Sequence, residues 1–267
     1  MSESKCRICP HECDLSVNPD GFCGGRNNYG KITALALDPI EKKPLRHFHA
    51  GSMILSVGSF GCNMRCGFCQ NHHISYCRGG NLPPATYISP QQLAEKAAEL
   101  VPQGNIGVAF TYNEPLIGFE YVLDCAKEIH EKGLKNVLVT NGLINAEPLA
   151  ELLPFIDAMN IDLKSFTSEF YKKLCGDLDV VKNTIVTASK VCHVEITTLI
   201  IPNENDSVEE ITAIAKWLAS IDKNILWHIS RYFPNHEYNT PAADVGKIYA
   251  LAEVAREWLV NVYSGNC

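Results

Sequence analysis

Residues 59–71 decide how the rest of the chain is interpreted, and they read Ser59-Phe60-Gly61-Cys62-Asn63-Met64-Arg65-Cys66-Gly67-Phe68-Cys69-Gln70-Asn71. Three cysteines at this spacing, with glycines that let the backbone curl, can aim three thiolates at one point. Cysteine thiolates hold iron–sulfur clusters, and a four-iron cluster with three protein ligands keeps one iron open for another molecule. The alternatives are buried thiols or a zinc site completed by a distant residue. Zinc motifs usually come as two close pairs, and no second pair sits nearby.

A second group of cysteines precedes this stretch. It consists of Cys6, Cys9, Cys13 and Cys23, the last following the turn-forming residues 18–21. Four thiolates complete a metal site, so this group predicts structural zinc or a second, electron-relaying iron–sulfur cluster, and the spacing does not separate the two. His11 is a possible substitute ligand. Free thiols or disulfides remain the alternative, which the expected reducing compartment disfavours.

The composition bounds the class of protein. With 267 residues, 46% of them hydrophobic and 20% charged, the chain has the size of one α/β barrel and can bury a large core. No apolar run approaches the ~20 residues of a membrane span, and residues 1–5 lack the start of a signal peptide. We therefore expect a cytoplasmic protein without a membrane partner. In that compartment 12 cysteines indicate metal or redox chemistry, and a net charge of −7 makes a nucleic-acid partner unlikely.

Hydrophobic patterns predict alternating strands and helices from residue 53 onward. Strands are expected at 53–58, 106–111, 136–140, 158–162, 193–200 and 224–230, after a lead-in strand at 31–37. Helices are expected at 90–101, 116–132, 146–153, 168–174, 184–191, 207–221 and 241–259. Strands separated by helices form parallel units, and six of them predict an α/β fold, a partial (β/α)6 TIM-type barrel open on one side. We assign residues 51–267 to it and residues 1–50 to a small cysteine-rich metal-binding segment with a lead-in strand and loop.

Polar residues follow the expected strands where catalytic groups of such barrels gather. These positions are residues 62–69, 111–114, 140–142, 162–164 and 202–203, with His228 inside the last expected strand. A basic loop at residues 41–47 leads into the first of them. Such a run is ordinarily a solvated surface, but here it can also contact a phosphate or carboxylate of substrate or cofactor. Cys77, Cys125, Cys175 and Cys192 lack partners at ligand spacing and are expected in the core.

Cys62, Cys66 and Cys69, with the aromatic Phe68, match the CxxxCxΦC signature of the radical S-adenosylmethionine (SAM) enzymes. Residues 38–45, 61–63 and 69–71 resemble the branch that contains pyruvate formate-lyase activating enzyme, and within it most closely the radical SAM enzymes of the AmmeMemoRadiSam system. The resemblance covers nearly the whole chain. It implies a [4Fe-4S] cluster on the three cysteines and SAM as the second cofactor. Relatives carry a similar amino-terminal cysteine set, which supports a metal there without naming it.

The resemblance also implies roles in SAM binding. Glu114 and Asn113 would accept hydrogen bonds from the SAM ammonium. Lys164 would form an ion pair with the SAM carboxylate, and Asp162 would orient Lys164. Relatives carry a Gly-Gly-Glu turn where this chain has Tyr112, Asn113 and Glu114, so only Glu114 carries over securely.

Four further residues are candidates for SAM binding. His228 resembles a histidine that contacts the SAM ribose, with Arg231, His236 or a core role for His228 as alternatives. Thr140 and Asn141 either contact the cofactor or only form a turn with Gly142. Phe68, like Tyr112, either stacks on adenine or packs in the core.

The implied activity is that of a radical SAM oxidoreductase working anaerobically. SAM would be cleaved reductively to methionine and a 5′-deoxyadenosyl radical that abstracts hydrogen, with an electron donor such as flavodoxin or ferredoxin. No side chain need act as acid or base in the first step, so no catalytic residue is predicted beyond the cluster and SAM. The substrate is either a glycine of a glycyl radical enzyme, as for an activase, or a small molecule or other protein, as in AmmeMemoRadiSam systems. A non-enzymatic electron-transfer module is the third reading.

Overall fold

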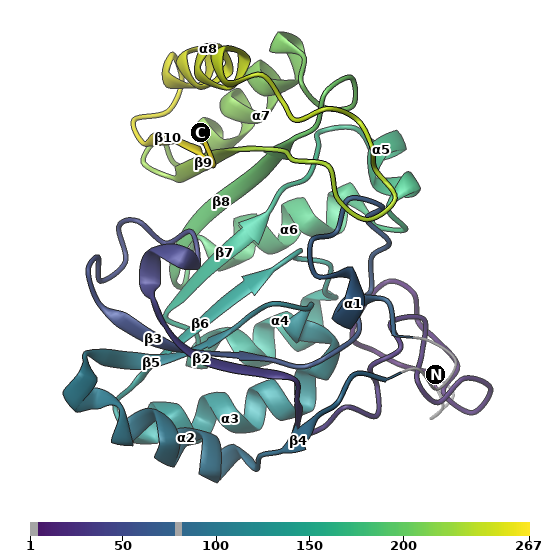
Figure 1. Cartoon of the computed structure of the whole chain (residues 1–267), viewed down its shortest axis with the longest axis vertical. Helices are drawn as coiled ribbons and strands as arrows, with labels where there is room; N and C mark the ends of the chain where they lie inside the picture. The colour runs from purple at the N-terminus through teal and green to yellow at the C-terminus, as the bar shows by residue number, and fades with distance from the viewer. Residues whose placement is uncertain (1–4, 78–81) are drawn as a thin grey trace.

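One curved sheet of eight strands forms the centre of the computed structural model, which describes residues 5–77 and 82–267 (Figure 1). Its order is β10-β9-β8-β7-β6-β5-β3-β2. Neighbouring strands are parallel from β3 to β10, and β2 pairs with β3 in the antiparallel sense. The strands are β2 (Ala34–Pro39), β3 (Met53–Gly58), β5 (Asn105–Phe110), β6 (Lys135–Thr140), β7 (Ala158–Asp162), β8 (His193–Ile200), β9 (Leu226–Arg231) and β10 (Val262–Gly265).

The helices connect successive strands and cover the outer face of the sheet, as Figure 1 shows for the longer ones. They are α1 (His72–Ser75), α2 (Pro90–Glu99), α3 (Phe119–Glu131), α4 (Ala146–Leu152), α5 (Ser168–Lys173), α6 (Leu178–Ala188), α7 (Val208–Ile221) and α8 (Val245–Arg256). Short 3-10 turns lie at Ile40–Lys42, Val101–Gln103, Pro115–Gly118 and Leu153–Phe155. Within the described residues, none of these helices has the length and apolar character needed to cross a membrane.

The predicted partial barrel is confirmed. All six predicted parallel strands are present in the predicted order, and the two edge strands, β10 and β2, do not pair with each other, so the sheet stays open. The strand β10 was not predicted, because only four residues take part and its alternation is too short to read. Helix α6 begins at Leu178, six residues before the predicted start at 184. The Asp177 side chain accepts hydrogen bonds from the amides of Asp179 and Val180 and so caps the earlier start.

Residues 5–30 form turns rather than helices or strands, and they pack against loops at the carboxyl ends of the strands. The Cys62 amide donates to the Cys23 carbonyl at 3.1 Å, and the Asn145 amide donates to the Ile8 carbonyl at 2.9 Å. After this segment, β1 (Lys31–Ile32) pairs with β4 (Thr86–Tyr87) in a separate two-stranded sheet. The lead-in strand β2 belongs to the large sheet, and a boundary at residue 50 stays a prediction.

The loop between β2 and β3, residues 43–52, is tied to strands from the other half of the sheet, and we call it the crossing loop. The Asn160 side chain on β7 donates to the Pro44 carbonyl at 2.9 Å. The backbone amides of Arg46 and His47 donate to the Glu195 carboxylate on β8 at 2.8–2.9 Å. The loop therefore connects one edge of the sheet directly to strands β7 and β8 in its other half.

Glu195 is the buried anchor of this loop, with 0% of its side chain exposed. His193 and His228 each place an Nε2 atom within 2.9 and 2.6 Å of its carboxylate oxygens. Burial alone would raise the pKa of Glu195, but hydrogen bonds from the two histidines and the two amides outweigh it and lower the pKa from 4.5 to about 2. The folded state therefore favours the ionised carboxylate.

We expect Glu195→Gln to lower the free energy of unfolding by roughly 3 kcal/mol at pH 7, because a depressed carboxyl pKa stabilises the folded protein above its unfolded pKa. The difference between wild type and variant should shrink as the pH falls from 4.5 towards 2. Urea unfolding at several pH values measures both effects. Glu209→Gln, at an exposed carboxylate, is the matched control, and an equal loss in both variants would contradict the assigned role of Glu195.

Candidate active site

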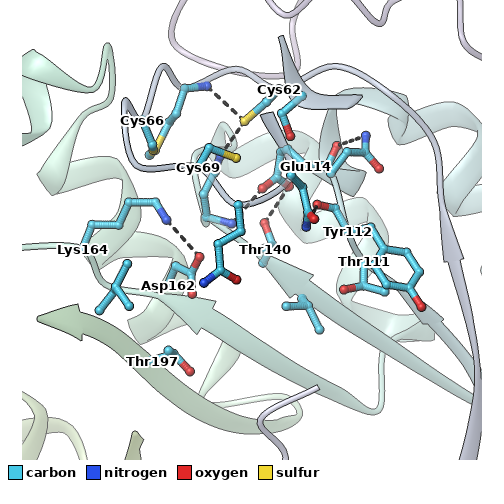
Figure 2. A pocket seen from close by; sticks show the side chains of 18 of the residues that line it. Cys62, Cys66, Cys69, Thr111, Tyr112, Glu114, Thr140, Asp162, Lys164 and Thr197 are labelled. Carbon is cyan, nitrogen blue, oxygen red and sulfur yellow. Dashed lines mark hydrogen bonds and ion pairs between the residues drawn. The ribbon is translucent and has the colours of Figure 1, made fainter. Parts of the chain in front are cut away.

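A cavity of about 400 Å³ opens at the carboxyl ends of the parallel strands (Figure 2). All seven parallel strands, or the loops that follow them, contribute lining residues, together with Lys42, Lys43 and Pro44 at or just before the start of the crossing loop. The lining residues are Lys42, Lys43, Pro44, Cys62, Met64, Cys66, Phe68, Cys69, Gln70, Asn71, Ser75, Thr111, Tyr112, Asn113, Glu114, Val139, Thr140, Asn141, Asp162, Lys164, Thr197, Leu199, Ser230 and Asn266. The sequence-predicted polar positions after β3, β5, β6 and β7 therefore meet in one place.

Cys62, Cys66 and Cys69 share one side of this cavity, on the loop that follows β3 (Figure 2). The loop is held from both flanks. The Asn63 side chain donates to the Leu143 carbonyl at 2.8 Å and accepts from the Asn141 side chain at 2.9 Å. Gly61, at a φ of +91°, is required, because a Cβ atom there would lie 2.8 Å from the Cys23 carbonyl oxygen.

The three thiols match the kind and number of ligands that hold a four-iron cluster with one iron left open. Within residues 5–77 and 82–267, no three cysteine, histidine or acidic side chains are arranged to hold one metal ion. A cubane binds each thiolate at a different iron, so its ligands need to share a cavity without converging on one atom. Burial raises the pKa of the Cys66 thiol to about 11 and that of Cys62 well above its usual range. Burial therefore favours the protonated thiols at neutral pH, and a bound metal is the kind of partner that would favour the thiolates.

Glu114 lies at the centre of the cavity wall, between the cysteine loop and β6 (Figure 2). Its carboxylate accepts hydrogen bonds from the Thr140 hydroxyl at 2.7 Å, the Asn141 amide at 2.7 Å and the Leu116 amide at 3.0 Å. Burial raises its pKa to about 7, although these three donors oppose the shift. A cationic ligand is the group that would favour its ionised form.

Asp162 and Lys164 form an ion pair on the side of the cavity next to Cys66, with 2.9 Å between Asp162 Oδ2 and Lys164 Nζ (Figure 2). Burial disfavours the Lys164 ammonium, but the Asp162 carboxylate outweighs burial and raises the pKa of Lys164. The lysine is therefore charged, and it lines the cavity where an anionic ligand group can reach it.

Four other predicted residues line the cavity but have structural partners. The Asn113 side chain accepts from the Ser59 amide at 2.9 Å and donates to the Gly61 carbonyl at 3.1 Å, so it holds the cysteine loop. Thr140 and Asn141 hold the Glu114 carboxylate, as described above. Phe68 packs against Phe170 and Tyr238, at ring distances of 6.4 and 5.5 Å, and one part of it reaches the cavity.

His228 is not among the residues that line the cavity. The His228 Nε2 atom is hydrogen-bonded to the Glu195 carboxylate. This matches the alternative prediction, in which His228 is a hydrogen-bonded core residue. Neither Arg231 nor His236 lines the cavity either, and Pro202 and Asn203 lie outside it.

Sequence reasoning missed Thr197, Leu199, Ser230 and Asn266. Thr197 and Leu199 could have been predicted from the alternating pattern of β8, because residues 195, 197 and 199 lie on one face of the strand.

Cys6, Cys9, Cys13 and Cys23 line a second, small cavity with Ile8, His11 and Phe22. Burial raises the pKa of Cys9 to about 11, and it also raises that of Cys23. His11 also lines this cavity, but its Nε2 atom lies 2.8 Å from the Asn63 carbonyl oxygen and so has a backbone partner. The four thiols are thus gathered as predicted, while a metal on them stays a prediction, since they do not adopt a single-ion arrangement within the described chain.

Residues 56–218 match the radical SAM superfamily, so the chain belongs to this superfamily. Its members use a [4Fe-4S] cluster and SAM, and the three-cysteine cavity described above is where this chain can hold them. Within the superfamily the chain falls in the branch of the pyruvate formate-lyase activating enzymes.

Individual relatives show how far the similarity extends. Uncharacterized protein MJ0808 of Methanocaldococcus jannaschii is 36% identical over 277 residues, which cover 98% of this chain and 81% of that protein. The pyruvate formate-lyase-activating enzyme of Clostridium pasteurianum is 28% identical over 62% of this chain and 67% of its own length. In fold, the crystal structure of QueE from Escherichia coli covers 90% of this chain and 95% of its own, with a TM-score of 0.54 and 15% identity.

Proposed function

We propose that this protein cleaves SAM reductively and uses the resulting 5′-deoxyadenosyl radical to abstract hydrogen from a substrate. The [4Fe-4S] cluster, when bound, supplies the electron for that cleavage. The observation that carries the proposal is that Cys62, Cys66 and Cys69 share one buried cavity with a carboxylate, Glu114, and an ammonium, Lys164. SAM carries an ammonium and a carboxylate, so the cavity offers a partner of opposite charge for each.

The residues of the chain then act as orienting groups. Glu114 would accept from the SAM ammonium, held in place by Thr140 and Asn141. Lys164 would meet the SAM carboxylate, held in place by Asp162. Phe68 offers an apolar surface next to the last cysteine, and the buried walls exclude water from the radical. His228, through Glu195, would instead fix the crossing loop beneath the cavity.

For the hydrogen donor we propose a glycine of a glycyl radical enzyme. The similarity to pyruvate formate-lyase-activating enzyme supports this choice, as does the open edge of the sheet, which would admit a loop of a partner protein. A flavodoxin or ferredoxin would supply the electron.

Two measurements test the proposal. Anaerobic, dithionite-reduced holoprotein should convert SAM to 5′-deoxyadenosine and methionine, and no conversion would refute the enzymatic function in favour of an electron-transfer module. Candidate glycyl radical enzymes are then added, and the glycyl radical is sought by electron paramagnetic resonance. SAM cleavage without a glycyl signal from any of them would favour a small molecule or another protein as substrate.

We further propose that the four amino-terminal cysteines hold zinc or a second cluster. Iron, sulfide and zinc in anaerobically purified protein distinguish these. About four irons with zinc would mean one cluster and a zinc site, and about eight irons would mean two clusters.

A further inference from the structure

The cavity has a second basic wall, opposite the Asp162–Lys164 pair. Lys42 and Lys43 line the cavity just before and at the start of the crossing loop, and the ammonium of Lys43 stands 4.8 Å from the centroid of the Tyr112 ring. Figure 2 shows Tyr112 and Lys164 on opposite sides of the cavity. The two basic groups are therefore separate sites for negative charge.

Lys43 is a buried ammonium with unused donors. Only 4% of its side chain is exposed. Among residues 5–77 and 82–267 it has one hydrogen-bond acceptor, Asp38 Oδ2, at 2.9 Å. An ammonium has three donors, and a buried one is costly unless they are satisfied. The remaining donors belong to a side chain that lines the cavity, so an acceptor on a ligand is the partner that would satisfy them.

The charge around Lys43 leaves room for one anion. Asp38 accepts from Lys43 and also from Lys42, whose Nζ lies 3.1 Å from Asp38 Oδ1 and whose side chain is 65% exposed. One carboxylate thus faces two ammonium groups, which leaves a net positive charge at this wall. A single carboxylate on a ligand would balance it.

Backbone strain at Tyr112 supports a role for this arrangement. Tyr112 has a φ of +72°, a left-handed conformation that strains a bulky residue and that glycine would adopt without strain. The Tyr112 hydroxyl donates to Asp38 Oδ2 at 2.8 Å, and its ring lies under the Lys43 ammonium. The strained tyrosine therefore positions both Asp38 and Lys43, which a glycine could not do.

We propose that Lys43, assisted by Lys42 and positioned by Asp38 and Tyr112, binds a carboxylate of the substrate. This inference rests on the proposed function, in which Lys164 on the opposite wall binds the carboxylate of SAM. Because SAM has a single carboxylate, the anion at Lys43 belongs to another molecule. The carboxylate recognised here belongs either to a small acid or to an acidic side chain of a protein substrate. In both cases it fixes the substrate on the side of the cavity away from Lys164.

The test uses succinate, with uncharged succinamide as the matched ligand, on anaerobic SAM-loaded holoprotein observed by saturation-transfer nuclear magnetic resonance. Wild type should bind succinate and discriminate against succinamide about tenfold, the worth of a charge-assisted hydrogen bond. Lys43→Met should lose that discrimination. Lys173→Met, at another lysine paired with a carboxylate but outside the cavity, should keep it.

A second variant guards against misfolding. Lys43→Met removes one of the two positive charges that balance the Asp38 carboxylate. The double variant Asp38→Asn, Lys43→Met removes both partners of this ion pair. It should unfold near the wild-type temperature and should also lose the discrimination between succinate and succinamide. Equal binding of succinate and succinamide by wild type, or unchanged discrimination in both variants, would overturn the inference. Formation of 5′-deoxyadenosine is measured on the same wild-type sample. Cleavage of SAM without succinate discrimination refutes only the carboxylate site, and discrimination without cleavage refutes only the proposed function.

Discussion

Cys66→Ala should abolish SAM cleavage. Cys66 is one of three thiols that share the cavity, and a cubane that loses one of three protein ligands is no longer held. We expect 5′-deoxyadenosine formation by the reconstituted, reduced variant to fall by on the order of a thousandfold or more. The SAM-induced change in the reduced-cluster spectrum should disappear with it.

Cys125→Ala is the matched control, because Cys125 is a fully buried thiol on α3 that does not line the cavity. It should retain both the cluster and the activity. If Cys66→Ala kept its spectral response to SAM, the assignment of the three cysteines would be wrong. The far-ultraviolet circular dichroism of both variants shows whether the barrel has formed, and so separates loss of the cluster from loss of the fold.

Glu114→Gln should weaken SAM binding about tenfold at pH 7.5 and remove its pH dependence. The pKa of Glu114 is raised by burial to about 7, and the SAM ammonium pairs with the ionised form. Below that pKa the carboxyl must first lose a proton, so wild-type affinity should fall as the pH drops from 7.5 to 5.5 and approach the affinity of the variant. Isothermal titration of holoprotein with SAM across this range measures both effects.

Glu209→Gln provides the control for a change of charge outside the cavity, and its pH profile should follow wild type. A pH dependence that persisted unchanged in Glu114→Gln would assign the titration to another group. In that case Asp162, the other carboxylate in the cavity, would be the next residue to replace.

Much of the fold was predictable because it rests on local patterns. Apolar runs such as 53–58 and 158–162 mark parallel strands buried on both faces, and their boundaries in the structure are those predicted. The position of Glu114, Asp162 and Lys164 in one cavity followed from the rule that loops after parallel strands meet at one edge. The cysteine spacing predicted that three thiols of one loop would lie close together, and all three line the cavity.

The rest depended on contacts between distant parts of the chain. Whether His228 faces SAM or the core is decided by Glu195, which is 33 positions away and whose partners include the crossing loop. The position of Lys43 depends in the same way on Tyr112, since nothing near Lys43 in sequence shows that an aromatic ring lies under it. Pair contacts of this kind carry no periodic signal. The strand β10 was not predicted, because its four residues are too few to show an alternating pattern.

The crossing loop has a mechanical consequence for the cavity. A closed barrel fixes its own radius through a complete ring of hydrogen bonds, whereas an open sheet is free to flatten or curl. In this protein Pro44, Arg46 and His47 connect one edge of the sheet to β7 and β8, so the length of residues 43–52 sets how far these parts of the sheet are held apart beneath the cavity. Insertions or deletions in that segment would thus change the size of substrate admitted, while every group that contacts SAM kept its place.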